Sequence, residues 1–363
     1  VLVDLPRINY DANGENGALL LEPSRTNLLE QGEYYNAYYT RDGVSVTDNA
    51  LTSPEGLQNA SKLVEDSANS KHRIGKATFP SGTQRTLSVF AKAGERNYIS
   101  LFENNAVGSD VKGAIFNLSN GTLSINNSPT YYSNPTIEPI GSSGWYRCSV
   151  TWTATSLSVP SFGVSADGLE NTYQGDGTSG IYIYGAQLEA GSYVSSYIPT
   201  MGTSETRAAD IVDGKEDSAL YNDIEGVLFV EFSALSATRD NEFRFMISNG
   251  TNDERLQIGL QTSGNLYASV ITGNSATASF NYTLPNPTQT HKVAIKYKAN
   301  DCALWVDGIE RGTDISATMP SGLDVFDFYR TPNNNNYVEA NVKQVIYFNE
   351  ALSDSELATL TTL

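Results

Sequence analysis

The 363-residue sequence is poor in the residues that catalytic and metal centres use most often. It has two cysteines, two histidines and three methionines. With only His72 and His291, a Ser-His-Asp triad or a zinc site with several histidines is nearly excluded by count. Cys148 and Cys302 each lie in an apolar, strand-like run, so they are expected to be buried free thiols rather than a disulfide.

Positive charge is also scarce. The chain has 23 Lys and Arg residues against 41 Asp and Glu residues, which gives a formal net charge of -18. Nucleic acid and anionic membranes repel such a chain unless basic residues are concentrated in a patch, and the sequence shows none. No stretch approaches the ~20 apolar residues of a membrane span. The sequence therefore predicts no nucleic-acid partner and no membrane insertion.

Short strand signals, by contrast, occur along most of the chain. These runs alternate or are rich in β-branched and aromatic residues, and Gly, Asn, Ser or Pro clusters bound them. Because no helical pattern intervenes, antiparallel sandwiches are favoured over a parallel sheet. We predict an all-β protein of two antiparallel β-sandwich (jelly-roll) domains in tandem with a short C-terminal helix. The expected strands are 85–92, 98–102, 145–152, 181–184, 226–232, 242–247, 255–260, 265–272, 291–297, 303–306 and 342–348.

A polar stretch separates the two strand-rich blocks. Residues 200–223 contain two glycines and several acidic side chains, so we expect the domain boundary near residue 205. The predicted domains are therefore 1–205 and 206–363.

Local signals mark the end of each predicted domain. Residues 181–188 are expected to form the last strand of the first domain, with Gly185 at a bulge or close backbone approach. Residues 191–199 are expected to lead away into the second domain. Near the C-terminus, Ser353 and Glu356 have the spacing of a capping box and predict a short helix.

Five strings of the first half carry a resemblance. They are PRINY at 6–10, LLLEPSRTNL at 19–28, GWYR at 144–147, GAQLE at 185–189 and SYIPT at 196–200. Together they resemble the non-catalytic modules of bacteriophage tail and other virion proteins, which are similar to jelly-roll carbohydrate-binding modules. The resemblance implies attachment to a polysaccharide or cell-surface glycan of a host, and a virion or extracellular location.

The second half resembles a different sandwich. Residues 226–232, 291–295, 304–308 and 345–349, followed by the helix signal, are similar in order to the laminin-G or concanavalin-like lectin sandwich. Catalytic members of the concanavalin-like group carry Glu-x-Asp-x-x-Glu along one strand, and no such string occurs here. We therefore expect non-catalytic carbohydrate binding rather than an enzyme.

Two other functions fit the sequence. One is a structural module that decorates or oligomerises a virion and binds no sugar; the other is a polysaccharide-degrading enzyme whose carboxylates meet only in the fold.

The chain begins at Val1 without a methionine, as an excised or processed piece would. Because no coiled-coil heptads are present, a homo-oligomer is expected to form through regions outside this sequence.

Aromatic clusters beside polar side chains are the main binding signal. Sugars present apolar faces edged with hydroxyls, so a site needs exposed rings for stacking and neighbours that hydrogen-bond. The same tyrosines also fit the edge of a sandwich with their hydroxyls in water, and four consecutive asparagines also fit a turn. The candidate carbohydrate-binding residues are Tyr34, Tyr35, Tyr38, Tyr39, Arg41, His72, Arg73, Tyr131, Tyr132, Tyr173, Arg330, Asn334 and Tyr337.

Calcium is the metal that the composition favours. Its hard oxygen ligands, from carboxylates, amides and backbone carbonyls, are abundant in the predicted loops. The resemblance to jelly rolls implies a structural Ca2+ ion between the first and last strands, where Glu30, Gln187 and Glu189 are candidate ligands. The alternative is that these side chains are solvated.

Overall fold

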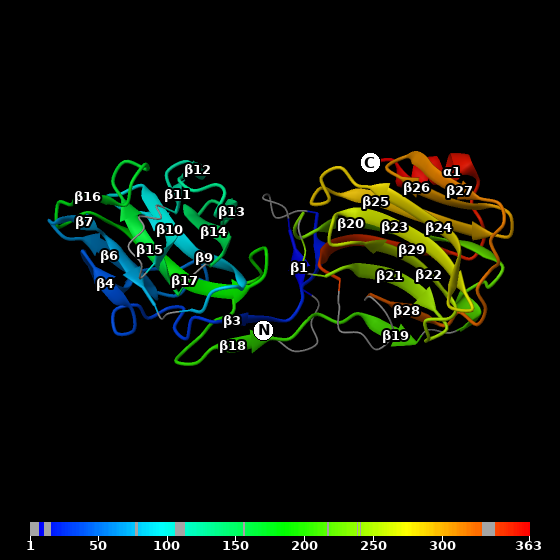
Figure 1. Ribbon diagram of the computed structural model, residues 1–363, viewed down its shortest axis with the longest axis horizontal. Helices are drawn as coiled ribbons and strands as arrows, with labels where there is room; N and C mark the ends of the chain where they lie inside the picture. Colours follow the sequence, from blue (N-terminus) through cyan, green and yellow to red (C-terminus); the bar gives the residue numbers. More distant parts are fainter. Residues whose placement is uncertain are drawn as a thin grey trace. The chain divides into compact units, whose positions relative to one another are not determined.

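The chain folds into two compact units of antiparallel sheets (Figure 1). The first unit comprises Arg25–Arg207, and the second comprises Val1–Ser24 together with Ala208–Leu363. The predicted all-β class, with sandwich domains and one C-terminal helix, is confirmed. The computed structural model describes residues 7–10, 16–76, 79–105, 113–154, 157–215, 218–237, 239, 241–328 and 338–363.

Two six-stranded sheets form the sandwich of the first unit. One has the order β13 (Tyr132–Pro139), β14 (Trp145–Thr153), β9 (Gln84–Ala93), β17 (Gly180–Ala190), β6 (Ala60–Glu65) and β5 (Val44–Leu51). The other has the order β12 (Thr122–Asn126), β11 (Ala114–Asn117), β10 (Tyr98–Asn105), β15 (Ser158–Ser165), β8 (Arg73–Gly75) and β4 (Thr40–Asp42). Two ribbons pair β7 (Asn69–Lys71) with β16 (Thr172–Gln174), and β3 (Arg25–Asn27) with β18 (Glu205–Arg207).

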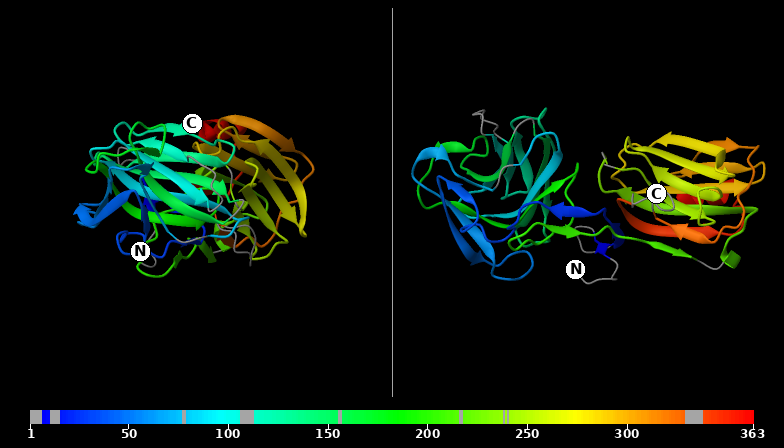
Figure 2. Two further views of the ribbon diagram at one scale, coloured as in Figure 1. Left: turned by 60° about the vertical axis from the view of Figure 1, so that its left-hand side comes forward. Right: turned by 60° about the horizontal axis from the view of Figure 1, so that its bottom comes forward.

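A seven-stranded and a six-stranded sheet form the second unit (Figure 2). The larger has the order β1 (Ile8–Asn9), β2 (Ala18–Leu21), β29 (Ala340–Phe348), β20 (Glu225–Ala234), β25 (His291–Lys298), β26 (Cys302–Val306) and β27 (Ile309–Asp314). The smaller has the order β19 (Asp213–Lys215), β28 (Val325–Asp327), β21 (Phe243–Ser248), β22 (Arg255–Leu260), β23 (Asn265–Thr272) and β24 (Ser275–Thr283). A 3-10 turn, η1, spans Ser218–Leu220.

In many of these segments every second side chain is apolar, which explains why they form strands with one buried face. In β9, Leu87, Val89 and Ala91 enter the core that also contains Ile99 and Leu101 of the opposite sheet. Successive side chains of a strand point to opposite faces, so every second residue reaches this core. The second unit has its own core between its two sheets, and the cores share no residues.

The N-terminal strand differs from the sequence prediction. β2 pairs with β29, and Leu21 is buried in the core of the second unit. The predicted domain 1–205 placed this strand in the first unit. Local sequence does not show the difference, because the partner strand lies at the other end of the chain.

The ends of the first unit lie next to each other. In the ribbon of β3 and β18, Arg25 lies directly opposite Arg207. The first unit is therefore an insertion in the sequence of the second, entered after Ser24 and left at Ala208.

Residues 191–199 also differ from the prediction. Asn27 Nδ2 donates to the carbonyl of Ile198 at 2.9 Å, and the Ile198 amide donates to Gln187 Oε1 at 2.7 Å. The segment therefore folds back on the first unit rather than leading away from it, because polar side chains of that unit satisfy its backbone groups.

The predicted bulge at Gly185 is confirmed. Gly185 has a φ of +64°, and the register between β17 and β9 shifts between Tyr184 and Gln187. A Cβ atom at Gly185 would lie 2.8 Å from the ring of Phe90. Both the backbone conformation and the close approach therefore require glycine.

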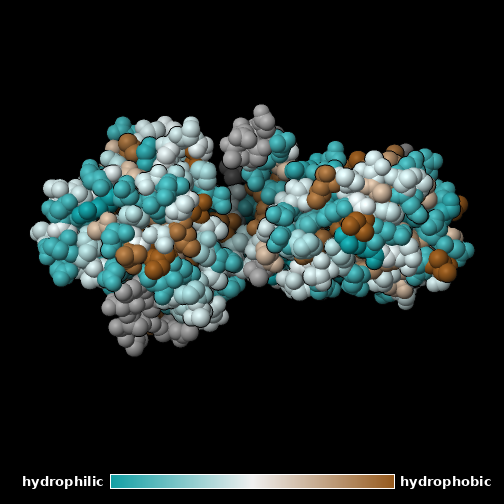
Figure 3. Space-filling view, turned by 90° about the horizontal axis from the view of Figure 1, so that it is seen from above, coloured by the Kyte–Doolittle hydropathy of each residue, from teal (hydrophilic) through white to brown (hydrophobic). Residues whose placement is uncertain are grey.

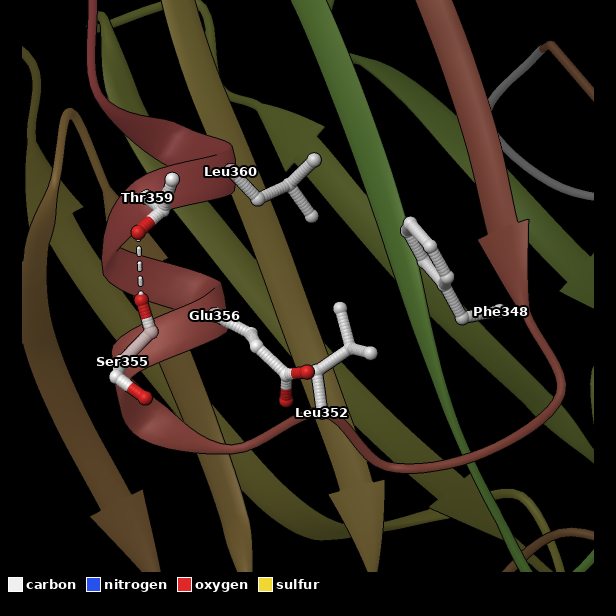
Figure 4. A pocket seen from close by; sticks show the side chains of 6 residues that line it. All are labelled: Phe348, Leu352, Ser355, Glu356, Thr359 and Leu360. Atoms are coloured by element: carbon white, nitrogen blue, oxygen red, sulfur yellow. Dashed lines mark hydrogen bonds between the residues drawn. The ribbon is translucent and has the colours of Figure 1, made fainter.

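The C-terminal helix begins where the capping box predicts. α1 spans Asp354–Thr361, with Ser353 and Glu356 making both bonds of the box. Leu357 packs with Phe229 and Trp305 on the face of the seven-stranded sheet opposite the main core. Beside α1 lies a hollow of about 500 Å³ (Figure 4). It is lined by Phe348, Leu352, Ser355, Glu356, Thr359 and Leu360.

The hydropathy of the surface and the burial of the two cysteines agree with what the composition predicts. The face drawn in Figure 3 is mostly hydrophilic or neutral, with small hydrophobic patches on each unit. The described part of the chain contains no helix with the length and apolar character of a membrane span. Cys148 and Cys302 are free and buried, as predicted, and burial raises the pKa of both thiols.

Candidate functional site

Two of the four tyrosines between residues 34 and 39 belong to the core, which corrects the expectation of a binding loop. Tyr35 is 0% and Tyr39 5% exposed. Their hydroxyls donate to the carbonyls of Gly32 and Gln31, each at 2.7 Å, and their rings pack 5.1 Å apart. Burial raises the pKa of both phenols far above the ordinary value.

The other candidates of this segment are more accessible. Tyr38 is 48% exposed, and the Nζ atom of Lys76 lies 5.6 Å from the centre of its ring. Tyr34 is half-buried. Arg41 is exposed and donates to Asn36 Oδ1 at 2.5 Å. The exposed ring of Tyr38 therefore keeps this segment a candidate contact, although the core takes Tyr35 and Tyr39.

Tyr131 and Tyr132 both bind Glu103, a buried residue of β10. Tyr132 is 1% exposed, accepts the Glu103 amide at 2.9 Å and packs edge-on against Trp152. Half-buried Tyr131 donates to the Glu103 carboxylate. The prediction that Tyr132 lines a sugar site is therefore wrong, because both its ring and its hydroxyl are used inside the first unit.

His72 and Arg73 are buried rather than set on an open sheet face. His72 is 0% exposed, with Nδ1 at 2.7 Å from the Gly43 carbonyl and Nε2 at 3.1 Å from the Tyr173 carbonyl. Arg73 is 9% exposed and donates to Ser161 Oγ at 3.2 Å. The expectation of surface binding residues is corrected for both side chains.

Tyr173 contributes to a buried charge cluster. Its hydroxyl donates to Glu65 Oε2 at 2.5 Å, and Arg96 Nε donates to the same oxygen at 2.9 Å. The Asp176 amide donates to Glu65 Oε1 at 2.8 Å. Burial alone would raise the pKa of Glu65, but these hydrogen bonds hold it below the ordinary 4.5. The cluster therefore fixes the loop of Asp176 to β6.

The predicted calcium ligands do not fit a cation. Gln187 and Glu189 are both 0% exposed, and Gln187 Nε2 donates to Glu189 Oε1 at 2.8 Å. Ser195 donates to both Glu189 oxygens, from its amide at 2.9 Å and from Oγ at 2.7 Å. Arg25 Nε lies 3.6 Å from the same carboxylate. Donors already surround these oxygens, whereas a Ca2+ ion needs their lone pairs.

Glu30, the third predicted calcium ligand, is exposed. The described residues contain no group of three or more His, Cys, Asp or Glu side chains suited to a metal ion. Calcium binding elsewhere in the chain stays a prediction. Arg330, Asn334 and Tyr337 lie outside the described residues, so their predicted role also stays a prediction.

A polar cluster that sequence reasoning missed lies on the six-stranded sheet of the second unit. In β21, β22 and β23, residues such as Phe245, Ile258 and Ala268 enter the core. The residues between them therefore point to the opposite face. We call this set the polar face; it comprises Arg244, Arg255, Gln257, Tyr267 and Ser269.

Hydrogen bonds join the polar face into one network. Gln257 Oε1 accepts from Arg244 Nη1 at 2.9 Å and from Arg255 Nε at 3.1 Å. Gln257 Nε2 donates to Ser269 Oγ at 3.3 Å. Arg244 Nε donates to the hydroxyl of Tyr267, and its guanidinium carbon lies 5.3 Å from the centre of that ring. These side chains are buried, with Arg255 and Tyr267 each 8%, Ser269 5% and Gln257 4% exposed, so the network joins three strands of the sheet rather than forming an open surface.

A glycine makes room for this ring. A Cβ atom at Gly259 would lie 2.3 Å from Cζ and 2.4 Å from the hydroxyl oxygen of Tyr267. The ring thus lies across Gly259, which pairs with Tyr267 in the register of β22 and β23. A longer side chain there has to push the ring away from Arg244.

We expect Gly259→Ala to disturb the polar face. Overpacking should lower the free energy of unfolding of the second unit by about 1–3 kcal/mol and displace the Tyr267 ring. Urea unfolding would measure the loss of stability, and a crystal structure of the variant would show the displacement of the ring. Gly312→Ala is the control for overpacking elsewhere in the second unit, because a Cβ atom there would lie 2.9 Å from Phe280 and not near Tyr267; equal ring displacement in both variants would contradict the expectation.

The sequence did contain a signal for this face. Phe243-Arg244-Phe245 and Leu256-Gln257-Ile258 place polar side chains between core residues with a period of two. The pattern predicts strands, and it also predicts which side chains share a face. The register between strands, which brings Arg244 beside Tyr267, is not visible in the sequence.

Comparison with known proteins finds a similarity between part of the second unit and lectin-like sandwiches. Residues 231–358 match the sequence model of the concanavalin A-like lectin/glucanases superfamily. The predicted resemblance of the second half to this group is confirmed at that level. The phage-tail resemblance of the first half stays a prediction. No curated protein matches the chain.

Several solved structures are similar to parts of the chain. The Ruminococcus gnavus IT-sialidase CBM40 shares 15% identity, with 41% of this chain and 92% of that chain covered and a TM-score of 0.33. Domains LG4-5 of the mouse laminin alpha1 chain share 10% identity, with 90% and 94% covered and a TM-score of 0.28. The SAP-like pentraxin of Limulus polyphemus shares 12% identity, with 37% and 68% covered and a TM-score of 0.29. Ligand assignment for this chain therefore rests on its own residues.

Proposed function

We propose that the protein binds carbohydrate and does not change it chemically. The observation that carries this proposal is the ring of Tyr38, which is 48% exposed, lies near the Nζ atom of Lys76 and belongs to the same segment as the exposed Arg41. A sugar needs such a combination, because its apolar face stacks on a ring while its hydroxyls exchange hydrogen bonds with polar neighbours. The match of residues 231–358 to a lectin-containing superfamily supports the same function.

The carboxylates near the polar face support binding rather than hydrolysis. Glu242 is held by Arg244 Nη2 at 3.0 Å, and Asp327 lies opposite Met246 in the register of β28 and β21. The four residue steps of extended chain from Glu242 to Met246 span roughly 13 Å. Paired carboxylates of glycosidases lie about 5–9.5 Å apart. Incubation with candidate polysaccharides should release no new reducing ends.

Replacing Tyr38 by alanine tests the proposed site. We expect Tyr38→Ala to weaken about tenfold the binding to polysaccharides that retard the unaltered protein, because the stacking ring is lost. Affinity electrophoresis of the full chain in polysaccharide gels measures this effect. Tyr10→Ala is the matched control, since it removes an exposed tyrosine from the second unit. Equal loss in both variants, or no retardation of the unaltered protein by any polysaccharide, would contradict the proposal.

The biological setting is part of the proposal. The strings shared with phage tail modules support a role in glycan or host-surface attachment, in a virion or outside the cell. A module that only decorates or oligomerises a virion would show no retardation in any gel.

A further inference from the structure

Two cations flank the exposed ring of Tyr38. The Nζ atom of Lys76 lies 5.6 Å from the centre of this ring, and Arg41 Nη1 donates to Asn36 Oδ1 at 2.5 Å. The second contact folds the Arg41 side chain back onto the turn that carries Tyr38. Asn36, Tyr38 and Arg41 are exposed and Lys76 is half-buried, so a ligand in solvent can reach them, in contrast to the buried side chains of the polar face.

Neither cation has an acidic partner in the part of the chain that the structure describes. No carboxylate among those residues forms an ion pair with Arg41 or Lys76, and Asp42, next to Arg41 in the chain, is used elsewhere. Its Oδ2 atom lies 3.6 Å from Arg73 Nε. Glu33, which precedes the turn, accepts hydrogen bonds from the hydroxyls of two tyrosines of the first unit. The turn therefore carries two positive charges that the protein itself does not balance.

Acidic partners are abundant in this chain, which makes the local excess of positive charge informative. The 41 Asp and Glu residues outnumber the 23 Lys and Arg residues. Lys62, Arg96 and Lys296 each bind a carboxylate. Two neighbouring cations without one attract an anion at contact distance.

The net charge limits the kind of anion. At -18 the whole chain repels a densely charged polymer. Such repulsion is screened beyond about 8 Å at physiological ionic strength, so a single anionic group on a neutral chain meets mainly the charges beside it. Guanidinium and ammonium groups donate charge-assisted hydrogen bonds to oxyanions of this kind.

We infer that this segment recognises a saccharide with an isolated carboxylate or sulfate group, which the charges of Arg41 and Lys76 attract while Tyr38 stacks on a sugar ring. The inference rests on the proposed function and names the class of sugar at the same site. Carboxylate and sulfate share the oxyanion chemistry that the two cations recognise, and separate ligands distinguish them.

Calorimetric titration of the full chain with short oligosaccharides tests the inference. Ligands with one uronic acid and ligands with one sulfate are compared with their carboxyl-reduced and desulfated forms. We expect at least one anionic form to bind about tenfold more tightly than its neutral counterpart, and this preference to shrink as salt rises from about 50 to about 500 mM. The pair of ligands that shows the preference identifies the anionic group.

Substitution of the two cations assigns the preference to this segment. The double variant Arg41→Gln, Lys76→Gln should lose the preference, keep its affinity for the neutral form within about twofold, and melt at nearly the same temperature. Arg41→Gln alone, at an exposed position, should lose part of the preference, and it serves if the double variant does not fold. Arg311→Gln is the matched control, because Arg311 lies 4.4 Å from the ring centre of Tyr282 in the second unit and should not affect the preference.

The outcomes separate the inference from the proposed function. Equal affinity for anionic and neutral forms, or an unchanged preference in the variants of Arg41 and Lys76, would overturn the inference while leaving glycan binding intact. No binding of any form would instead contradict the proposed function.

Discussion

Replacing Tyr39 by alanine is expected to lower the free energy of unfolding of the first unit by about 3–5 kcal/mol, as for other large buried aromatics. Tyr38→Ala should change it by no more than about 0.5 kcal/mol, as for most exposed positions. The two tyrosines are adjacent and chemically identical, but Tyr39 packs on Tyr35 and Tyr38 faces solvent. Comparing Tyr38→Ala with Tyr39→Ala therefore isolates the contribution of side-chain burial to the free energy of unfolding.

Urea unfolding of the full chain measures this difference. Trp145 and Trp152 report on the first unit, and Trp305 reports on the second, so a transition can be assigned by comparison with a Trp305→Phe chain. Tyr39→Phe is the control that removes only the bond to the Gln31 carbonyl, and it should cost about 1 kcal/mol. Equal destabilisation by Tyr38→Ala and Tyr39→Ala would show that Tyr39 is not a core residue.

Replacing Arg96 by methionine should destabilise the first unit by about 3 kcal/mol at neutral pH, because the buried Glu65 carboxylate loses its cation. The pKa of Glu65 lies below its ordinary 4.5 in the folded protein. Its contribution to stability is therefore present above pH 4.5 and lost as the pH falls through the lower folded pKa. In Arg96→Met, the loss of stability that accompanies protonation of Glu65 at low pH should be smaller than in the unaltered protein or should change sign.

Thermal unfolding between pH 3 and 7 tests the expectation. The double variant Arg96→Met, Glu65→Gln removes both charges and should be more stable at pH 7 than Arg96→Met alone. Lys92→Met is the control for loss of a half-buried cation, since Lys92 donates to the Ser143 carbonyl and forms no ion pair with a carboxylate in the described part of the chain. A double variant no more stable than the single one would mean that the ion pair does not hold the loop of Asp176.

Local patterns in the sequence were sufficient for the strands, the bulge and the helix. Val89 and Ile258 lie in alternating runs, Gly185 interrupts one such run, and Ser353 caps the helix, so each depends on neighbours in the chain. The position of β2 could not be predicted in this way. Its partner β29 is at the opposite end of the chain, and a short apolar strand carries no information about which sheet it joins.

The candidate site was predicted less well for a related reason. Composition selects tyrosines but does not separate exposed Tyr38 from buried Tyr39, because burial depends on packing across the sheets. The polar face was missed because the register that brings Arg244 beside Tyr267 depends on the arrangement of neighbouring strands. Glu189 was misassigned because a buried carboxylate can be satisfied by hydroxyl and amide donors as well as by a metal.

The pairing of Leu19 with Val342 has a consequence for synthesis of the chain. Translation produces β2 before the first unit and β29 after it, so β2 waits while the first unit is made and folds. Closing a long flexible loop costs entropy that grows with loop length. Because Arg25 and Arg207 are paired, the folded insertion shortens that loop before β29 leaves the ribosome. We therefore expect the folded first unit to reduce the entropic cost of pairing β2 with β29 in the second unit.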